Sequence, residues 1–445
     1  MLLNSVFSYF QSKLSWIYQK SFVLQKIDTL IFWNIIFLIL VSSFAPSDNI
    51  GYFGLFVIIL TSIKMLTCQG ERFSLSLGDK FLLIYFTIVL ISVAGSSLFL
   101  YSLKGFCKTL IYLGFYACFV NFIKNNKNKI KYIFLAIAVV VIGEAFVALK
   151  QNFLSVAEIS GWQDMSRLNP EQIMTRVYGT LKPYNPNLFG GYLLATLPST
   201  LILVYLPLLN KHIKTAICGI LLFTLGTVAT ILTGCRGAYI ALLAEFILLS
   251  FLTYRILKPY YKKIFITISS IIAGISAFVL LSVASLRARI FSIFAMRNDS
   301  SNSFRFNVYN SCIEMFKDNW LLGIGVGNQN FREIYGLYMR TGFDALSAYN
   351  IYLETAVESG IFALIAFLGF IIFNIYNAIK YIFKRKKLNT LYLTIALVSV
   401  VGILIHGFVD TVFFRPQIQF IFWIMMGIIR VITFPKDVRY VRARN

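Results

Sequence analysis

Apolar stretches of about 20 residues, the length that a membrane-spanning helix needs, recur along most of the chain and limit its fold more than any other feature. Apolar residues make up 58% of the chain and charged residues 13%, whereas soluble domains average about 45–50% and about 25%. The sequence therefore predicts an all-α polytopic membrane protein. It excludes a soluble enzyme and a nucleic-acid-binding domain, and the net charge of +23 has to be interpreted through membrane topology.

About twelve spans are expected, nine within residues 29–285 and three within residues 351–434. The predicted spans are 29–46, 50–67, 80–98, 102–123, 130–150, 187–209, 213–233, 236–256, 263–285, 351–379, 389–409 and 417–434. Two connecting segments are long, a shorter loop at 151–186 and a larger loop at 286–350 between spans nine and ten. Long loops in compact proteins are usually functional.

The two ends of the chain differ in pattern from the spans. Residues 1–28 mix apolar and polar side chains in a way that favours an amphipathic helix on the cytoplasmic membrane surface. Residues 435–445 form a basic tail. Most of the 41 Lys and Arg residues lie in the first segment, in alternate loops and in this tail. The positive-inside rule therefore predicts that both termini are cytoplasmic and that both long loops lie on the outer, periplasmic side.

The cations predicted on the outer side are mostly arginines, which run against the topology signal and need another explanation. They are Arg167, Arg176, Arg236, Arg287, Arg289, Arg297, Arg305, Arg332, Arg340 and Arg415. Guanidinium groups bind phosphate and carboxylate oxygens in a bidentate manner. We therefore predict a shared anion site on the outer face. The alternative is that these arginines pair with loop carboxylates or lipid headgroups.

Ionisable residues in or beside the spans are further candidates, because charge inside a membrane is costly. Glu144 and Glu245 lie within predicted spans. Arg236 begins span eight among small residues, TGCRGA, and is expected to be poorly screened. The remaining candidates form groups at helical spacing: Lys104 and Lys108; Asn350, Glu354 and Glu358; His406 and Asp410, followed by Arg415. A carboxylate four residues after a histidine can orient it and raise its pKa; the alternative is a structural pair.

The large loop contains its own predicted helix and a glycine-rich break. Residues 303–319 repeat apolar side chains at helical spacing, with Ser303 as the expected N-cap. Residues 323–328, GIGVGN, do not lie between a strand and a helix, so we reject a nucleotide-binding interpretation. A tight turn that approaches a ligand or the membrane is one interpretation, and a purely structural turn is the other. The six cysteines form no CxxC motif and only two histidines are present, so no metal site is expected.

Together these motifs resemble the O-antigen ligase and polymerase superfamily of membrane transferases that act on lipid-linked glycans. The resemblance lies in RVYG (176–179) with NPN (185–187), TGCRG (233–237), residues 305–328, YNIYLE (349–354) with ESG (358–360), and HGFVD (406–410). Two stretches, ALSAYN (345–350) and VDTVFFRP (409–416), are closest to a subgroup labelled as bicarbonate transporters.

The resemblance implies a metal-independent, inverting glycosyltransferase without a cofactor in a bacterial inner membrane. The implied partners are a polyprenyl-pyrophosphate-linked glycan as donor, a lipid or glycan acceptor, and membrane lipids. Arg176, Arg236 and Arg305 would bind the pyrophosphate, and Tyr349, Glu354 or His406 would position or deprotonate the acceptor hydroxyl. Asn350, Asp410, Arg415, Lys104 and Lys108 would support the site.

One position departs from the family pattern, which typically has His-Asn where this chain has Tyr349-Asn350. A phenol has a pKa near 10 and is a poor base at neutral pH. Three alternatives to an O-antigen ligase therefore stay open. They are a polysaccharide polymerase of the same superfamily, an anion (bicarbonate) transporter, and a non-catalytic assembly protein.

Overall fold

The computed structural model describes residues 2–153, 176–257, 259–384 and 388–434. All regular structure in these ranges is helical, which confirms the predicted fold class. The predicted loop at 151–186 and the predicted basic tail at 435–445 fall largely or wholly outside the described residues.

Eleven helical segments in the described ranges are long and apolar enough to cross a membrane. They are α4 (Ser47–Thr67), α5 (Leu77–Ala94), α6 (Phe99–Asn125), η1 with α7 (Lys127–Phe153), α8 through η4 to α9 (Pro186–Leu209), α10 (Ile213–Leu232), α11 (Arg236–Ile256), α12 (Pro259–Ser282), α16 (Ile351–Lys384), α17 (Leu388–His406) and α18 (Pro416–Thr433). The predicted first span corresponds to α3 (Ile27–Val41), which has 15 residues and is shorter than the usual spanning length of about 20.

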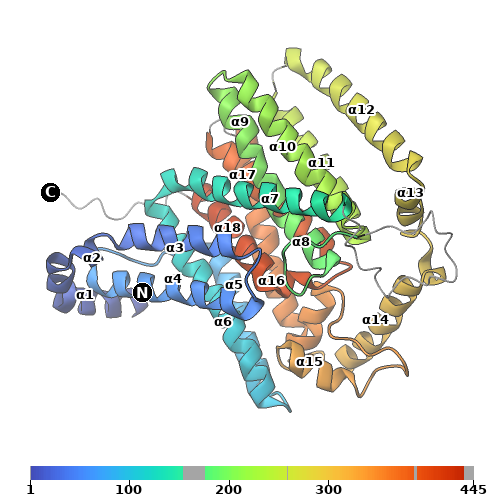
Figure 1. Ribbon diagram of the computed structural model, residues 1–445. Coiled ribbons are helices and arrows are strands. Elements are labelled where there is room, and N and C mark those ends of the chain that lie inside the picture. The colour runs from blue at the N-terminus through green and yellow to red at the C-terminus, as the bar shows by residue number, and fades with distance from the viewer. Residues whose placement is uncertain (1, 154–175, 258, 385–387, 435–445) are drawn as a thin grey trace.

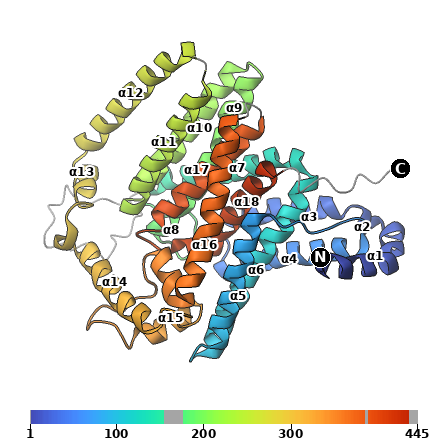
Figure 2. The ribbon, with the colours of Figure 1, turned by 180° about the vertical axis from the view of Figure 1, so that it is seen from behind.

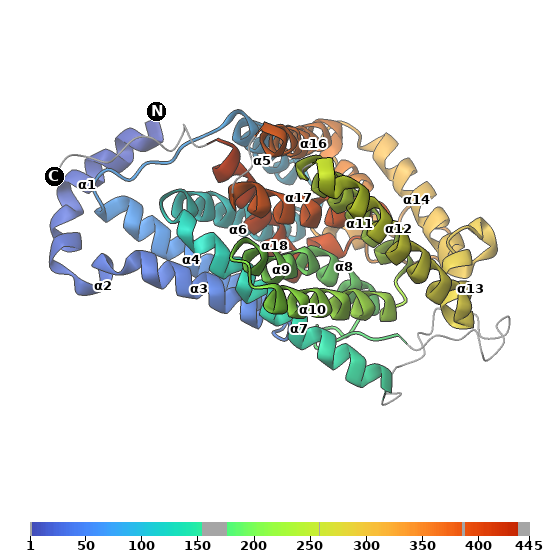
Figure 3. The ribbon, with the colours of Figure 1, turned by 90° about the horizontal axis from the view of Figure 1, so that it is seen from above.

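The bundle is built around α17 and α18, the most buried of the long helices. In the three views these two helices lie in the middle of the molecule, with α5, α6 and α16 on one side and α7 to α11 on the other (Figures 1–3). By contrast α12 lies at the edge, and none of its residues is buried. The final helices of the chain therefore join elements that are far apart in sequence.

Successive long helices alternate in direction, so their connections gather at two ends of the bundle. One end, the loop end, carries residues 283–350 with α13 (Ala284–Phe291), α14 (Ser300–Asp318) and α15 (Asn328–Tyr335). The other, the α1 end, carries α1 (Leu2–Lys20) and α2 (Phe22–Gln25). Exposed aromatic side chains and lysines share the surface of α1, in keeping with the amphipathic pattern.

Two local predictions are corrected by the structure. The helix expected at 303–319 begins at Ser300, and its N-cap is Asp299, whose carboxylate accepts the backbone N–H of Asn302 at 2.9 Å. Ser303 lies inside the helix because Asp299 is already placed to satisfy the first free donors. Helix α16 is longer than expected and is interrupted at Gly360, where φ is +80°.

Candidate functional site

Arg176 lies across the short turn between α10 and α11. Its Nε donates to the Thr233 carbonyl at 2.8 Å, and its Nη2 donates to Asn187 Oδ1 at 2.6 Å. Gly234 in this turn has φ of +62°, and a Cβ there would lie 3.0 Å from the Arg176 side chain. Only glycine suits both the backbone conformation and the space, which explains the glycine of the TGCRG motif.

The loop that carries Arg176 is held by two side chains of α7. The Glu144 carboxylate accepts the Thr180 backbone N–H at 2.9 Å and also its hydroxyl. Gln151 accepts the N–H of Gly179 at 3.0 Å and donates to its carbonyl at 2.9 Å. Glu144, singled out from the sequence as a costly charge within a span, therefore anchors the loop that presents Arg176.

Two more arginines lie near the turn before α11: Arg236, the first residue of α11, and Arg289 of α13. Arg236 contacts the Asp299 carboxylate at 2.8 Å and donates to the carbonyl and hydroxyl of Ser292 at 3.2 and 3.3 Å. The prediction that Arg236 is poorly screened is therefore wrong, because the loop after α13 folds back and places the Asp299 carboxylate beside it. Arg289 of α13 donates through Nε to the Gly234 carbonyl at 2.7 Å.

The positive charges of these arginines act on one another. Burial lowers the pKa of Arg176, and burial together with the charges of Arg176 and Arg236 lowers the pKa of Arg289 to about 10. Arg289 therefore remains protonated at neutral pH, and the three arginines concentrate positive charge that is unfavourable without an anion. Such a group of guanidiniums is suited to a phosphate or pyrophosphate.

Arg305 of α14 joins this group through a shared carboxylate. Its Nη2 lies 3.8 Å from Asp410 Oδ2, and the same oxygen accepts Asn187 Nδ2 at 3.3 Å. Arg305 also donates to Ser301 at 3.0 Å and lies over the Tyr349 ring, 5.8 Å from its centre. Its Nε is buried without a hydrogen-bond partner among the described residues. We call Arg176, Arg236, Arg289 and Arg305 the arginine cluster.

Tyr349 lies in a strained turn immediately before α16. Its φ is +50°, which is uncommon for a residue other than glycine. The Tyr309 hydroxyl donates to the Tyr349 carbonyl at 3.1 Å and to the Phe408 carbonyl at 3.4 Å. The buried Glu354 carboxylate accepts the Ala348 N–H at 2.9 Å. Contacts from α14 and α16 thus hold this turn beside Arg305.

The surroundings of Tyr349 make its phenol a weaker acid than usual. Burial raises the pKa of Tyr349 above its ordinary value of 10, and the nearby Asp410 carboxylate adds to the increase. The neighbouring Asn350 caps α16 by accepting the N–H groups of Tyr352 and Leu353 at 2.9 and 3.0 Å. Because its pKa is raised, the Tyr349 phenol stays protonated at neutral pH and can donate a hydrogen bond.

His406 is buried at the end of α17 and contacts Cys235 rather than the expected Asp410 side chain. Its Nε2 lies 3.5 Å from Cys235 Sγ. The Asp410 carboxylate instead binds Asn187, Arg305 and the N–H groups of the next two residues. Burial raises the pKa of Cys235, but the hydrogen bond with His406 and the charges of His406 and Arg176 together leave the pKa below its ordinary value.

The glycine-rich break is a structural turn pinned between helices. Gly323, Gly325 and Gly327 have φ of +73°, +98° and +124°. The Gly325 N–H donates to the Glu358 carbonyl at 2.9 Å, and the Gly327 N–H donates to the Glu358 carboxylate at 2.9 Å. A Cβ on Gly105 of α6 would lie 2.4 Å from the Val326 carbonyl oxygen. The glycine-rich turn therefore packs closely against the neighbouring helices α6 and α16.

The remaining predicted residues lie at the surface of the loop end. Lys104 and Lys108 are exposed on α6, and Lys108 Nζ lies 3.9 Å from the exposed Asp48 carboxylate. Arg415 is exposed in front of α18. Within the described part of the chain, we find no direct contact between these three side chains and the arginine cluster.

The structure adds residues that sequence reasoning left out of the site. In the sequence Arg289 is one of many outer arginines and Asn187 is part of the NPN motif, so neither stands out as a site residue. Asp299 carried no signal, because its role depends on how the loop folds back. No group of three or more His, Cys, Asp or Glu side chains that could hold a metal ion occurs among the residues that the structure describes.

Comparison with known proteins agrees with the motifs. Residues 220–368 match the family model described as O-Antigen ligase. This segment contains Arg236, Arg289, Arg305, Tyr349 and Glu354, whereas Arg176, His406 and Asp410 lie outside it. No curated protein matches the chain. The match over residues 220–368 and the eleven apolar helices of the described ranges support the prediction of a membrane protein that resembles the O-antigen ligase and polymerase superfamily.

Proposed function

We propose that this protein is a membrane glycosyltransferase that moves a glycan from a polyprenyl-pyrophosphate donor to a hydroxyl of an acceptor, as an O-antigen ligase does. The observation that carries the proposal is the arginine cluster. Four guanidiniums from separate segments gather around the start of α11, and Arg305 Nε is buried without a partner among the described residues. A pyrophosphate supplies the negative charge and the acceptor oxygens that this arrangement calls for.

The cluster would act on the leaving group. As the bond between the anomeric carbon and the pyrophosphate oxygen breaks, negative charge develops on that oxygen. Guanidiniums that are already fixed by hydrogen bonds stabilise such charge without reorganising. Arg176 and Arg289 are fixed by carbonyls of the 233–234 turn, and Arg236 by Asp299. Neither a metal nor a cofactor is part of the proposed mechanism.

The acceptor would lie on the Tyr349 side of the cluster. Its hydroxyl attacks the anomeric carbon in one step, so the configuration inverts. The protonated Tyr349 phenol would orient that hydroxyl, and Asp410, beside Arg305, would accept its proton. Glu354 and His406, bound to Ala348 and Cys235, would support the Tyr349 turn and the start of α11.

The proposed location is a bacterial inner membrane with the loop end on the periplasmic side and both termini in the cytoplasm. The distribution of lysines supports this orientation. The polyprenyl tail of the donor would remain in the bilayer between helices while its pyrophosphate reaches the arginine cluster at the loop end.

The test uses the full-length protein in lipid, supplied with a polyprenyl-pyrophosphate glycan and two acceptors, a lipid A core and a glycan. We expect released polyprenyl pyrophosphate and a larger product from the wild type, and loss of both with Arg236→Ala and Arg305→Ala. Arg332→Ala is the matched control, because Arg332 pairs with Asp344 at the surface, 53% and 60% exposed.

The acceptor that grows identifies the reaction. Extension of the lipid A core indicates a ligase, and extension of the glycan indicates a polymerase. If no donor is consumed by folded protein with either acceptor, the glycosyltransferase proposal fails. Anion flux in liposomes would then test the transporter hypothesis.

A further inference from the structure

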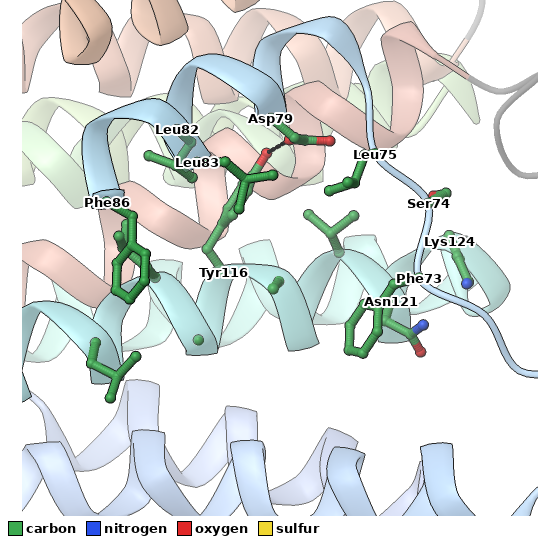
Figure 4. Close-up of a pocket in the computed structure, with 15 residues that line it drawn as sticks. Phe73, Ser74, Leu75, Asp79, Leu82, Leu83, Phe86, Tyr116, Asn121 and Lys124 are labelled. Carbon is green, nitrogen blue, oxygen red and sulfur yellow. Dashed lines mark hydrogen bonds between the residues drawn. The ribbon is translucent and has the colours of Figure 1, made fainter. Parts of the chain in front are cut away.

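A cavity between α5 and α6 lies apart from the arginine cluster. Its volume is about 230 Å³, several times the ~30 Å³ that a water molecule occupies in the liquid. Figure 4 shows Leu82, Leu83 and Phe86 of α5 on one side and Tyr116, Asn121 and Lys124 of α6 on the other. Residues 73–75 close one end of it.

The walls of the cavity are mostly apolar. Leu83 and Leu110 line it and are exposed on the outside of the bundle, so the cavity opens toward the surface that lipid would contact. Known small-molecule sites are usually larger, about 300–1,000 Å³, and place several polar groups around the ligand. The size and the walls therefore suit a narrow apolar chain better than a sugar or a nucleotide.

Polar groups lie at one end only, the α1 end. The Asp79 carboxylate there accepts hydrogen bonds from Tyr116 at 2.8 Å and from Arg430 at 2.9 Å, so its negative charge is compensated. Lys124 lines the same end and donates to the Arg72 carbonyl. An ammonium group has three donors, so Lys124 retains the capacity to bind a phosphate.

The balance of charge at this end is positive. Arg72 and Lys80, which flank the closing segment, are both exposed. Lys124 lines the cavity, and Arg72 and Lys80 lie next to lining residues in the chain. The nearby Glu71 is already paired with Lys64 at 3.0 Å, so this end of the apolar cavity has a basic rim. This combination of an apolar slot and a basic rim complements a lipid with an anionic headgroup.

We propose that the α5–α6 cavity binds one acyl chain of an anionic glycerophospholipid, whose phosphate contacts Lys124 at the α1 end. The polyprenyl tail of the proposed donor is a different lipid, and its pyrophosphate would lie at the opposite, loop end of the bundle. The site is therefore independent of the proposed function. By filling the space between α5 and α6, the bound lipid would stabilise the packing of these two helices.

Retention of lipid by the full-length protein tests this proposal. The protein is placed in nanodiscs with equal amounts of phosphatidylglycerol and phosphatidylcholine, and native mass spectrometry measures the lipid that remains bound. In Ala117→Phe, a bulky ring replaces a small residue of the cavity wall. Ala273→Phe, at an exposed position of α12, is the control.

We expect the wild type and the control to retain phosphatidylglycerol. Ala117→Phe should retain about tenfold less, which corresponds to a tenfold weaker equilibrium constant for lipid binding. Lys124→Gln should retain lipid but lose about fivefold of the preference for phosphatidylglycerol. Lys263→Gln, at an exposed lysine near the N-terminal end of α12, should keep that preference.

Two outcomes would overturn the proposal. One is equal retention of phosphatidylglycerol by folded Ala117→Phe and wild type, together with an unchanged preference in Lys124→Gln. The other outcome comes from a second experiment, in which polyprenyl phosphate is added to the nanodiscs. If the wild type retains it in place of phosphatidylglycerol and Ala117→Phe does not, the cavity holds a polyprenyl chain. Either result leaves the glycosyltransferase proposal unaffected.

Discussion

The Arg305 guanidinium lies 3.8 Å from the Asp410 carboxylate, and this pair joins α14 to the turn that follows α17. The same carboxylate oxygen accepts Asn187, which in turn binds Arg176. One polar chain therefore connects four segments that are spread over more than 200 residues. Its integrity can be tested at the central carboxylate.

Asp410→Asn should lower turnover at least about tenfold while donor binding changes much less. The amide has nearly the same shape, but it cannot act as the proton acceptor, so the loss falls on the transition state. Rates at saturating donor, together with equilibrium donor binding, separate the two effects. Asp344→Asn, in the exposed pair with Arg332, is the control and should behave like the wild type. Unchanged turnover in Asp410→Asn would remove this residue from the mechanism.

Arg289→Ala should weaken donor binding or turnover by about tenfold or more, since a charge-assisted hydrogen bond contributes ~1.5–3 kcal/mol. Arg289 is half-buried and hydrogen-bonded to the Gly234 carbonyl. Arg287, two residues earlier, is exposed and donates to the Leu281 carbonyl. Arg287→Ala is therefore the matched control. Equal effects of the two variants would indicate that overall positive charge, rather than a defined site, attracts the donor.

Tyr349→Phe should keep activity within about tenfold, because a lost neutral hydrogen bond costs ~0.5–1.5 kcal/mol. Burial raises the pKa of Tyr349 above its ordinary value, so the phenol is protonated throughout the range below that value. A reaction that needed the phenolate would speed up about tenfold for each pH unit between roughly 7 and 9. We expect no such rise in the pH profile of the wild type. If the rate rises with pH in the wild type but not in Tyr349→Phe, Tyr349 is the base.

The buried pair of Asp79 and Arg430 should be important for stability. Arg430 Nε lies 2.9 Å from Asp79 Oδ2, and the two side chains are 1% and 8% exposed. Arg430→Met leaves a buried carboxylate without its cation, which costs about 3–5 kcal/mol. Thermal unfolding in nanodiscs should show a clear loss, whereas Arg332→Met, at a surface pair, should cost less than about 1 kcal/mol. Similar losses in both variants would contradict this account.

Gly323→Ala should destabilise the loop end by about 1–3 kcal/mol or more, the cost of a strained backbone. Its φ is +73°, and a Cβ would lie 2.4 Å from the backbone of Glu358. Gly143→Ala on α7 is the control, because nothing lies within 4 Å of its Cβ position. Proteolysis of the loop end, followed with temperature, should separate the two variants. A Gly323→Ala protein as resistant as the wild type would show that the turn can relax.

The sequence by itself determined the membrane class, most spans and the identity of the arginines. Length and apolar composition decide whether a segment can cross a bilayer, and both are local properties. The motifs 176–179, 233–237 and 305–328 pointed to three of the four residues of the cluster for the same reason, since each carries its own arginine. The family model is consistent with that prediction.

Only the tertiary structure decided which groups meet. Helical spacing suggests that the Asp410 side chain pairs with His406, four residues earlier. In the structure His406 contacts Cys235, which is 171 residues away in the chain. Arg236 acquires Asp299, and Glu144 acquires Thr180, through loops that fold back on distant helices. These pairings depend on long-range packing, whose energy is a sum over the whole bundle, so no local pattern of residues encodes them.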